Sequence, residues 1–163
     1  MKKSNTRVFF YLTVRDFGIS GEEYLPCVSC MNPLLDISLP AERRIGIIEH
    51  LDFPILDFDL PKISNAHSPM SIMRFIASSE VIVTNSYHSL YWATLMKKKT
   101  VLYKPFSSKF KNLKIQSVIF DGNLDDAVAA SKIHESYLSE CRKLNVDFAH
   151  KLLRIMKKID FGD

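Results

Sequence analysis

The stretch VIVTNSYHSLYWA, residues 81–93, begins as a run of β-branched apolar residues and breaks at the polar residues 84–86. It then continues as a second, aromatic-rich apolar run, and the ionisable His88 stands near the start of that run. A short β-branched run is typical of a buried strand, and a longer apolar run after a polar break is typical of a buried helix. The stretch therefore predicts a strand, a polar loop and a helix in direct succession.

The segments on both sides repeat this alternation of strand and helix. Apolar segments predict strands at residues 7–14, 45–48, 80–84, 100–104 and 117–121. Capping residues and helical periodicity predict a short helix from Ser20 and further helices over residues 69–78, 89–96, 125–144 and 146–159. Strands that alternate with helices pair in parallel through right-handed crossovers. We therefore predict an α/β fold with an open parallel sheet flanked by helices.

Two serine residues supply the helix-start signals. Ser20 has Glu23 three residues later, which is the spacing of a capping box. Ser68 precedes Pro69, and proline is favoured in the first turn of a helix. Residues 26–40 contain three prolines, and we expect them to be mostly loop.

Length and composition describe an ordinary globular protein. The chain has 163 residues, and we predict a single domain over residues 1–163 with C-terminal helices from about residue 125. A hydrophobic content of 47% with a charged content of 25% argues against disorder. The formal net charge of +4 is too small to indicate nucleic-acid binding, and it suits a small anionic ligand.

The opening sequence MKKSNTRVFFYLTVRD has a basic start and an apolar stretch, as a signal peptide does. The apolar stretch at residues 8–14 is short and runs directly into Arg15 and Asp16, so we interpret it as a strand. No apolar run approaches the ~20 residues that span a bilayer. We therefore expect a cytoplasmic protein without a transmembrane segment.

The three cysteines are Cys27, Cys30 and Cys141, and the first two form a CxxC pair. An odd and sparse set is not a disulfide framework. A zinc site requires a second ligand pair, which the sequence does not offer, so we predict no metal site. A redox pair requires a helix that starts at the first cysteine, and Pro33 follows closely. We therefore interpret Cys27 and Cys30 as ordinary, partly buried thiols.

Polar residues follow two of the predicted strands. Arg15 and Asp16 follow the first strand, and Asn85-Ser86-Tyr87-His88-Ser89 follows the third. Ligands of parallel sheets bind beyond the carboxyl ends of the strands, and a helix N-terminus there favours an anion. His88 can exchange protons near neutral pH, and Arg15 has the planar fork that suits a carboxylate or phosphate. The two segments together predict an anion site.

Structural roles for the same residues stay open. His88 can cap its helix or bond a backbone carbonyl, and Arg15 can form a local ion pair with Asp16. The aromatic residues at 87–92 are expected to pack against the core. Ser89 has no Ser-His-Asp pattern around it, so nucleophilic catalysis is not expected. The remaining histidines show no ligand spacing and receive no role; they are His50, His67, His134 and His150.

Residues 75–104, FIASSEVIVTNSYHSLYWATLMKKKTVLYK, resemble the hallmark of the polysaccharide pyruvyl transferase family. That hallmark is a helix ending in small residues, a strand, a loop with a histidine, a buried helix and a further strand. YLTVRDFGIS, residues 11–20, is similar to the family's strand-ending Val-Arg-Asp. CMNPLLDI, residues 30–37, is similar to its Asp-Pro segment, with Asn32 in the Asp position. The resemblance covers most of residues 8–105 in the family's order.

The resemblance implies a single Rossmann-like lobe of glycosyltransferase-B type. It implies transfer of a pyruvyl group from phosphoenolpyruvate to a sugar of a cell-surface polysaccharide, either exopolysaccharide or capsule, with no further cofactor. His88 would be the catalytic acid–base residue. The implied substrate-binding residues are Arg15, Asp16, Asn85, Ser86 and Ser89. Where active family members tend to have Arg-x-His, this chain has Ser86-Tyr87-His88.

Two other function hypotheses stay open. The chain can be a glycosyltransferase-like protein that binds a nucleotide sugar at the same edge, with Glu49 and Asp52 as the nearby carboxylates for a ribose. It can also be a non-catalytic one-lobe subunit of a polysaccharide synthesis complex. The expected partners are phosphoenolpyruvate or another phosphorylated small molecule and a sugar acceptor, but no nucleic acid. Because the family usually has two lobes, we also expect a second lobe from another chain or a homo-oligomer.

Overall fold

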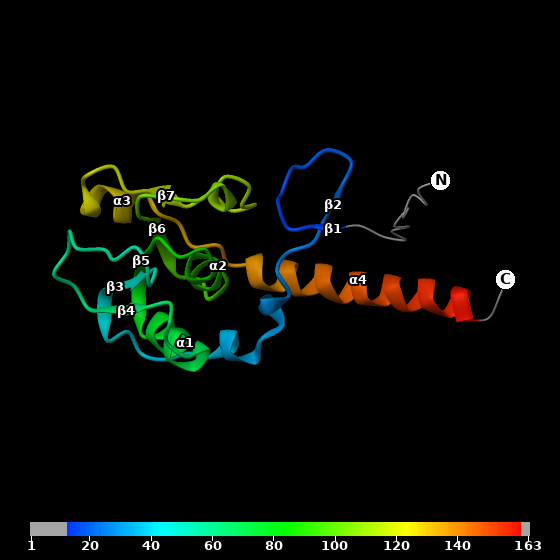
Figure 1. The fold of residues 1–163 in the computed structure, drawn as a ribbon. Helices are drawn as coiled ribbons and strands as arrows, with labels where there is room; N and C mark the ends of the chain where they lie inside the picture. Colours follow the sequence, from blue (N-terminus) through cyan, green and yellow to red (C-terminus); the bar gives the residue numbers. More distant parts are fainter. Residues whose placement is uncertain (1–12, 161–163) are drawn as a thin grey trace.

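A computed structural model describes residues 13–160, which form a five-stranded sheet, a second sheet of two strands and a long C-terminal helix (Figure 1). The strands of the main sheet lie in the order β4-β3-β5-β6-β7, and every pairing is parallel. They are β3 (Arg43–Glu49), β4 (Lys62–Ser64), β5 (Ser79–Thr84), β6 (Lys99–Leu102) and β7 (Val118–Ile119). The predicted α/β fold with an open parallel sheet is confirmed. Strand β4 was not predicted, because three residues at a sheet edge carry no periodic pattern.

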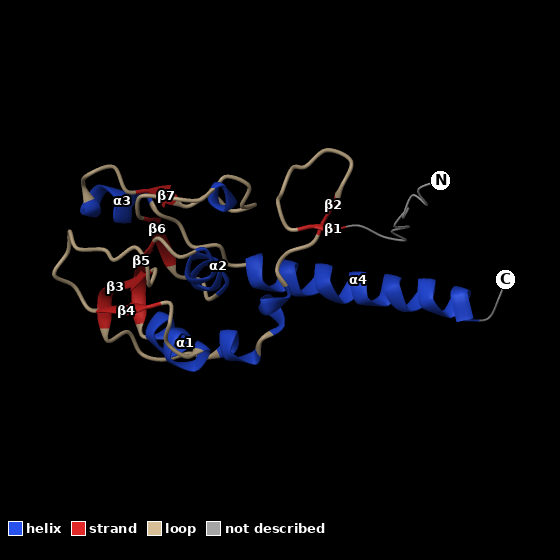
Figure 2. Ribbon diagram, viewed as in Figure 1, coloured by secondary structure: helices blue, strands red, loops and turns tan. Residues whose placement is uncertain are grey.

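Helices cover both faces of this sheet (Figure 2). Helices α1 (Pro69–Ala77) and α2 (Tyr87–Leu95) pack on one face, and α3 (Leu124–Ala130) packs on the other. In β5, Ile82 joins the core under α1 and α2, whereas Val81 and Val83 join the core under α3. Successive strand residues point to opposite faces, so a strand covered on both sides is apolar at nearly every position. This explains the continuous apolar run that opens residues 81–93.

The predicted start of α1 and the predicted end of α2 are confirmed to within one residue, whereas α2 begins two residues before the predicted Ser89. Ser68 is the N-cap of α1, where its hydroxyl accepts a hydrogen bond from the Ser71 amide at 3.2 Å, and Pro69 is the first helical residue. Helix α2 ends before the three lysines at 97–99, where Lys97 has a φ of 57°. A left-handed residue directly after a helix reverses the chain and leads it into the next strand, β6.

The first strand lies outside the main sheet, so its predicted place in that sheet is wrong. Strand β1 (Thr13–Val14) pairs in parallel with β2 (Glu23–Tyr24), and the two form a separate sheet. The Val14 carbonyl accepts a hydrogen bond from the Leu25 amide at 2.9 Å, which extends this local pairing. The predicted strand residues 7–12 lie outside the described part of the chain.

The short helix predicted from Ser20 is also wrong. Gly18 and Gly21 both have a φ of 82°, which lies in the left-handed region that glycine adopts without a steric penalty. Two left-handed residues around Ser20 turn the chain instead of starting a helix. Glu23, the expected partner of Ser20 in a capping box, is a strand residue.

The proline-containing segment 26–40 includes two short 3-10 helices that pack on the C-terminal helix. They are η1 (Val28–Met31) and η2 (Pro33–Asp36). Arg142, on the C-terminal helix, donates to both carboxylate oxygens of Asp36 at 2.8 Å. The Arg142 guanidinium lowers the pKa of Asp36, because it stabilises the charged form. The segment is mostly loop, as predicted, but it is anchored to the helix.

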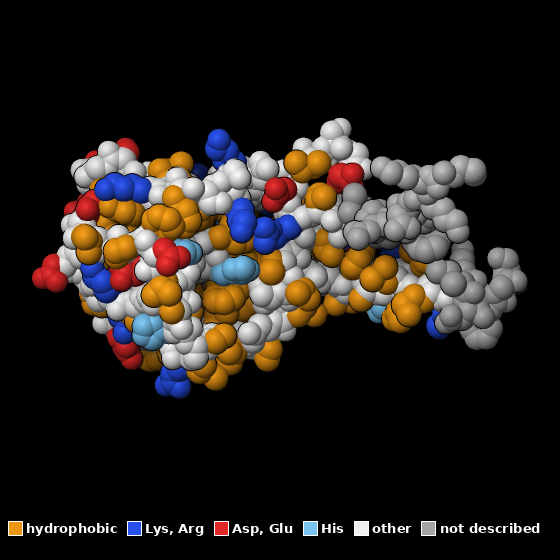
Figure 3. Space-filling view, in the orientation of Figure 1, with side chains coloured by type: hydrophobic (Ala, Val, Ile, Leu, Met, Phe, Trp, Pro, Cys, Tyr) orange, Lys and Arg blue, Asp and Glu red, His pale blue; other side chains and the backbone are white. Residues whose placement is uncertain are grey.

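The C-terminal helices divide at a different place from the predicted one. Helix α3 ends at Ala130 and its C-cap is Ser131, whose hydroxyl donates to the Val128 carbonyl at 2.7 Å. Helix α4 (Tyr137–Asp160) is continuous. Asn145 does not break α4, because its amide donates to the Cys141 carbonyl at 3.0 Å within the helix. Helix α4 extends away from the main sheet, with hydrophobic side chains along it (Figures 1 and 3). Within residues 13–160, no helix is both long enough and apolar enough to cross a membrane.

Gly46 provides a first prediction about stability. A Cβ atom at this position of β3 would lie 2.6 Å from Phe75 and 2.7 Å from the Ser79 hydroxyl. We expect Gly46→Ala to lower the free energy of unfolding by about 1–3 kcal/mol, because α1 must move away from the sheet to admit a methyl group. Urea denaturation measures the change. The double variant Gly46→Ala/Phe75→Leu should recover part of the loss, and equal stability of Gly46→Ala and the parent chain would contradict the close packing.

Candidate functional site

The order of the strands places the candidate site between β3 and β5. The chain passes from β3 to β4 on one side of β3 and then returns to β5 on the other side. Ligands of open parallel sheets bind at such a reversal, in the crevice beyond the carboxyl ends of the strands. The loop after β5 consists of Asn85 and Ser86 and leads directly into the first turn of α2, and the loop after β3 begins with His50. The two loops therefore meet at the edge where a ligand is expected.

A small cavity occupies this edge, and we call it the edge pocket. Its volume is about 160 Å³. Its lining comes from the loops after β3, β4, β5 and β6 and consists of His50, Asn65, Ser86, Tyr87, His88, Phe106, Ser107, Lys109 and Phe110. Two imidazoles, one ammonium group and two hydroxyl-bearing serines in one small cavity suit an anion with several oxygen atoms. Acidic side chains are not part of this lining.

Helix α2 begins at the edge pocket with an uncapped N-terminus. Ser86 is the N-cap, but its side chain makes no capping hydrogen bond and instead accepts from the Ser89 hydroxyl at 3.1 Å. Ser89 is buried, so this contact is internal. The first amides of a helix have no acceptor within the helix, and the helix dipole favours negative charge there. Ser86 lines the edge pocket, whereas Ser89 is buried and holds the Ser86 hydroxyl in place.

The end of β5 is fixed to β3 by Thr84. The Thr84 hydroxyl donates to the Ile48 carbonyl and accepts from the Ser86 amide at 3.0 Å. Thr84 is fully buried. The first residue of the loop is therefore held in place by the neighbouring strand.

Asn85 is a structural residue in this conformation of the loop. It is 3% exposed, and its amide oxygen accepts from the His50 amide at 2.7 Å. Its amide nitrogen donates to the Phe53 carbonyl, also at 2.7 Å. Both ends of the side chain are thus occupied by the turn after β3, so the predicted contact of Asn85 with substrate is replaced by a positioning role.

His88 is exposed and lies near a cysteine that the sequence did not connect with it. The His88 side chain lies near the Cys27 thiol and is the main cause of its low pKa, because it stabilises the thiolate. The pKa of Cys27 is lowered to about 6; burial opposes the shift, and the hydroxyl and amide of Ser29 add to it. An imidazole has two ring nitrogens, so His88 can serve Cys27 and a ligand of the edge pocket at the same time. His88 does not cap α2, whose N-cap is Ser86, and its side chain has a neighbour in Cys27.

Arg15 and Asp16 lie beside the same helix but outside the lining of the edge pocket. The Arg15 guanidinium carbon lies 4.7 Å from the centre of the Tyr87 ring, a cation–π contact. The buried Nε atom of Arg15 has no hydrogen-bond partner among residues 13–160. The Asp16 carboxylate accepts from the Asn112 amide at 3.5 Å. The structure therefore brings both predicted segments to Tyr87, but through packing rather than through a shared sheet edge.

Two residues of the edge pocket were missed, His50 and Lys109. The Nδ1 atom of His50 accepts from the Asp52 amide at 3.2 Å, which leaves Nε2 to donate to a ligand. Lys109 belongs to η3 (Ser108–Phe110), a short 3-10 helix after β6. The position of His50 at the end of a predicted strand was an available signal. Lys109 had no such signal, because four residues separate it from Lys104, the last residue of the predicted strand at 100–104.

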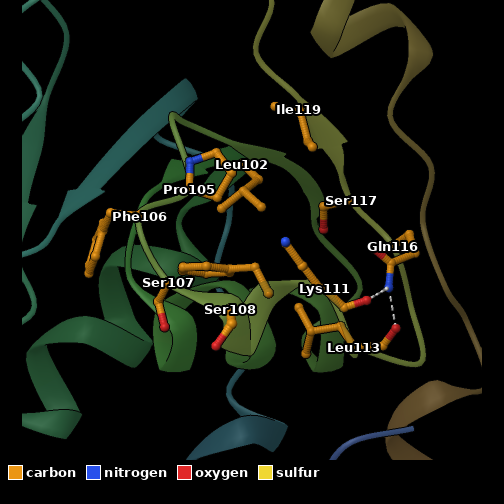
Figure 4. A pocket seen from close by; sticks show the side chains of 11 residues that line it. Leu102, Pro105, Phe106, Ser107, Ser108, Lys111, Leu113, Gln116, Ser117 and Ile119 are labelled. Carbon is orange, nitrogen blue, oxygen red and sulfur yellow. Dashed lines mark hydrogen bonds between the residues drawn. The ribbon is translucent and has the colours of Figure 1, made fainter. Parts of the chain in front are cut away.

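A larger cavity adjoins the edge pocket and shares Phe106, Ser107 and Phe110 with it. We call it the β6–β7 cavity; its volume is about 540 Å³. Figure 4 shows its mainly apolar wall, whose polar side chains are Ser107, Ser108, Lys111, Gln116 and Ser117. The Gln116 amide nitrogen donates to the carbonyls of Lys111 and Leu113. A flat or apolar part of a ligand fits here better than a charged part.

Exposed aromatic rings border the two cavities. The rings of Phe53 and Phe106 lie 4.3 Å apart, and His50 lies edge-on to Phe106 at 5.2 Å. Both phenylalanines are about half exposed, at 48% and 46%. Exposed aromatic rings beside a polar pocket suit a ligand with one apolar face, such as a sugar ring.

Comparisons with known proteins identify no relative of this chain. Searches of protein families, of curated proteins and of solved structures found no match. Among residues 13–160, histidine, cysteine and acidic side chains form no group of three that could hold a metal ion. The function must therefore be argued from the edge pocket itself.

Proposed function

We propose that the edge pocket binds phosphoenolpyruvate and that the protein takes part in pyruvyl transfer to a sugar in cell-surface polysaccharide synthesis. The supporting observation is the convergence of His50, His88 and Lys109 with the uncapped N-terminus of α2 at the carboxyl edge of the sheet. Phosphoenolpyruvate carries a phosphate and a carboxylate, and each needs several hydrogen-bond donors. The proposal agrees with the resemblance of residues 75–104 to the pyruvyl transferase family.

The chemistry assigns separate roles to the pocket residues. During transfer, the enol carbon gains a proton and a sugar hydroxyl adds to the neighbouring carbon. A second hydroxyl of the sugar then takes the place of phosphate and closes a ketal; of the two hydroxyl protons, one balances the proton on the enol carbon and the other leaves with phosphate. The His88 imidazole is the proton donor in this proposal. Lys109, His50 and the α2 amides hold the phosphate and stabilise it as it leaves. The exposed pair Phe53 and Phe106 forms the platform for the acceptor sugar.

The size of the pocket favours a small donor over a nucleotide sugar. Pockets for drug-sized ligands occupy about 300–1,000 Å³, whereas the edge pocket has about 160 Å³. A nucleotide sugar would fit only by extending into the β6–β7 cavity, past Phe106 and Phe110. Because of the β6–β7 cavity, nucleotide-sugar binding is the second candidate function, and the base of the nucleotide would lie beside Gln116.

Exposed apolar side chains at the carboxyl edge support a further part of the proposal, a partner lobe. Leu51, Phe53 and Leu56 in the loop after β3 are exposed, and so is Phe106 after β6. We propose that this chain is one lobe of glycosyltransferase-B type and acts in the cytoplasm, and that a second lobe closes over this edge. A lobe interface would cover these side chains. If the partner lobe carries all the catalytic residues, the chain is a non-catalytic subunit.

Phosphoenolpyruvate binding is the direct test. Isothermal titration of the purified chain should give saturable binding that weakens as salt is added, because the pocket is open to solvent. We expect His88→Ala to lower the affinity about 10–100-fold and Lys109→Ala about tenfold, since a hydrogen bond to a charged group contributes about 1.5–3 kcal/mol. Lys132→Ala, which removes the same charge from an exposed position after α3, is the matched control and should bind as the parent does.

The same titration separates the three candidate functions. Binding of a uridine diphosphate sugar without phosphoenolpyruvate binding would replace the pyruvyl donor by a nucleotide sugar. If the folded chain binds neither compound, both enzyme hypotheses fail and the non-catalytic subunit is the function that is left. Equal losses for Lys109→Ala and Lys132→Ala would show attraction by net charge and would refute the edge pocket as the site.

A further inference from the structure

The CxxC sequence forms a closed turn in this fold. The Cys30 amide donates to the Cys27 carbonyl at 3.1 Å, and Cys27 is the residue directly before the 3-10 helix η1. A turn closed by such a bond brings the Cα atoms of its first and fourth residues to within about 7 Å of each other. This is close to the range that a disulfide spans, so Cys27 and Cys30 can join with a local adjustment of the turn.

The two cysteines of this turn have opposite environments. Cys27 is half-buried, and its sulfur lies 3.2 Å from the Ser29 hydroxyl. That hydroxyl accepts from the Trp92 ring nitrogen at 3.0 Å and keeps its own proton free to donate to a Cys27 thiolate. His88 lies near the same sulfur and lowers the pKa of this thiol. The sulfur of Cys27 is thus surrounded by donors that stabilise a thiolate.

Cys30 is fully buried behind Cys27. Its sulfur accepts a hydrogen bond from the Asn145 amide of α4 at 3.3 Å. Burial raises the pKa of Cys30, whereas His88 lowers that of Cys27. Dithiol–disulfide exchange needs one thiolate that attacks an external disulfide and a second thiol that later releases the bound group. The exposed part of Cys27 suits the first role, and the buried, protonated Cys30 suits the second.

We propose that Cys27 and Cys30 are a redox-active dithiol, in which Cys27 attacks and Cys30 resolves. The oxidant is a small-molecule disulfide of the glutathione class. The Cys27 thiolate attacks one sulfur of that disulfide, a mixed disulfide forms, and one thiolate leaves and takes up a proton. Cys30 then loses its proton and attacks the Cys27 sulfur, which releases the second thiol. The protein loses two electrons and the small disulfide gains two. This assignment replaces the interpretation of both cysteines as ordinary thiols.

This inference does not depend on the proposed function, although the two share His88. Oxidation removes the thiolate that His88 contacts, so the redox state of the turn changes the hydrogen bonding of a pocket residue. The proposal concerns the pair itself, and its test requires no phosphoenolpyruvate.

Trapping of the mixed disulfide tests the proposal on the full chain. After exposure to oxidised glutathione and alkylation of the remaining thiols, tryptic peptides are weighed. Cys27 and Cys30 lie in one peptide, residues 16–43, and Cys141 lies in another, residues 133–142. We expect the parent chain to form an internal disulfide in residues 16–43, while Cys141 stays alkylated. Cys30→Ser should stop at one glutathione on Cys27, and Cys27→Ser should carry none.

Cys141→Ser is the matched control, because Cys141 is as buried as Cys30 but lies on α4 outside the turn. It should oxidise as the parent chain does. If Cys30→Ser does not fold, judged by circular dichroism, the parent chain and Cys141→Ser decide the matter by the internal disulfide alone. Glutathione on Cys141 as readily as on Cys27, or a pair that stays fully alkylated in oxidised glutathione, would overturn the proposal.

Discussion

The Cys27 thiol should ionise with a midpoint near pH 6 in a titration of thiolate absorbance, well below the ~8.5 of an unperturbed cysteine. The physical cause is the nearby His88 side chain, which stabilises the charged form, so the thiolate appears at lower pH than in a free thiol. Subtraction of the titration of Cys27→Ser isolates this group from Cys30 and Cys141. The other titratable groups beside the turn, among the described residues, are Tyr87, Tyr91 and Arg142.

Variants of His88 determine whether the imidazole is the cause of the low pKa. His88→Ala should move the midpoint towards ~8.5, because the leading stabilising contact is lost. His88→Gln, which keeps a neutral donor, should give an intermediate value. An unchanged midpoint in His88→Ala would refute the assignment, whatever the stability of the variant.

The parent chain and His88→Ala should differ in opposite directions at low and high pH in their rates of reaction with glutathione disulfide. At pH 6, a shift of the midpoint from ~6 to ~8.5 lowers the thiolate fraction about 150-fold, while the higher basicity raises nucleophilicity about tenfold. His88→Ala should therefore react about tenfold more slowly than the parent at pH 6 and faster at about pH 9. A merely structural role of His88 predicts no such reversal.

Asn85→Ala should destabilise the fold by about 2–4 kcal/mol. The side chain makes two hydrogen bonds of 2.7 Å, to the His50 amide and to the Phe53 carbonyl. Their removal leaves poorly solvated backbone groups without partners, and each such loss costs about 1–3 kcal/mol. The free energy of unfolding in urea measures the effect.

Asn65→Ala is the control for that prediction. Asn65 makes one hydrogen bond to the same loop, from the Leu51 amide at 2.9 Å, and this bond is exposed to solvent. The same chemical change should therefore cost only about 0.5–1.5 kcal/mol. Similar losses for the two variants would show that Asn85 does not fix the loop. A weaker affinity of Asn85→Ala for phosphoenolpyruvate would extend its positioning role to His50.

The candidate site was predicted only in part. Residues 85–89 were placed correctly at the end of a strand, because the polar break after a β-branched run is a local signal. The roles within the loop were not predicted. Asn85 and Ser89 make internal contacts, and His88 meets Cys27 across a sequence separation that no local pattern crosses.

The sequence by itself determined the α/β class, the strands β3, β5, β6 and β7, the start of α1 and the end of α2. These features follow from apolar periodicity, from the Ser68-Pro69 start and from the lysines after α2, all of which act within a few residues of the backbone they affect. The short helix from Ser20 failed because a capping-box spacing also occurs in turns, and two left-handed glycines outweighed it.

Only the tertiary structure decided the strand order, and with it the place where the loops after β3, β4, β5 and β6 meet. It also decided that β1 lies outside the main sheet and that η1 packs between α2 and α4. These arrangements depend on which apolar faces cover one another, and many segments of similar pattern compete for each face. The edge pocket and the Cys27–His88 contact arise from that choice, because both join residues far apart in the chain.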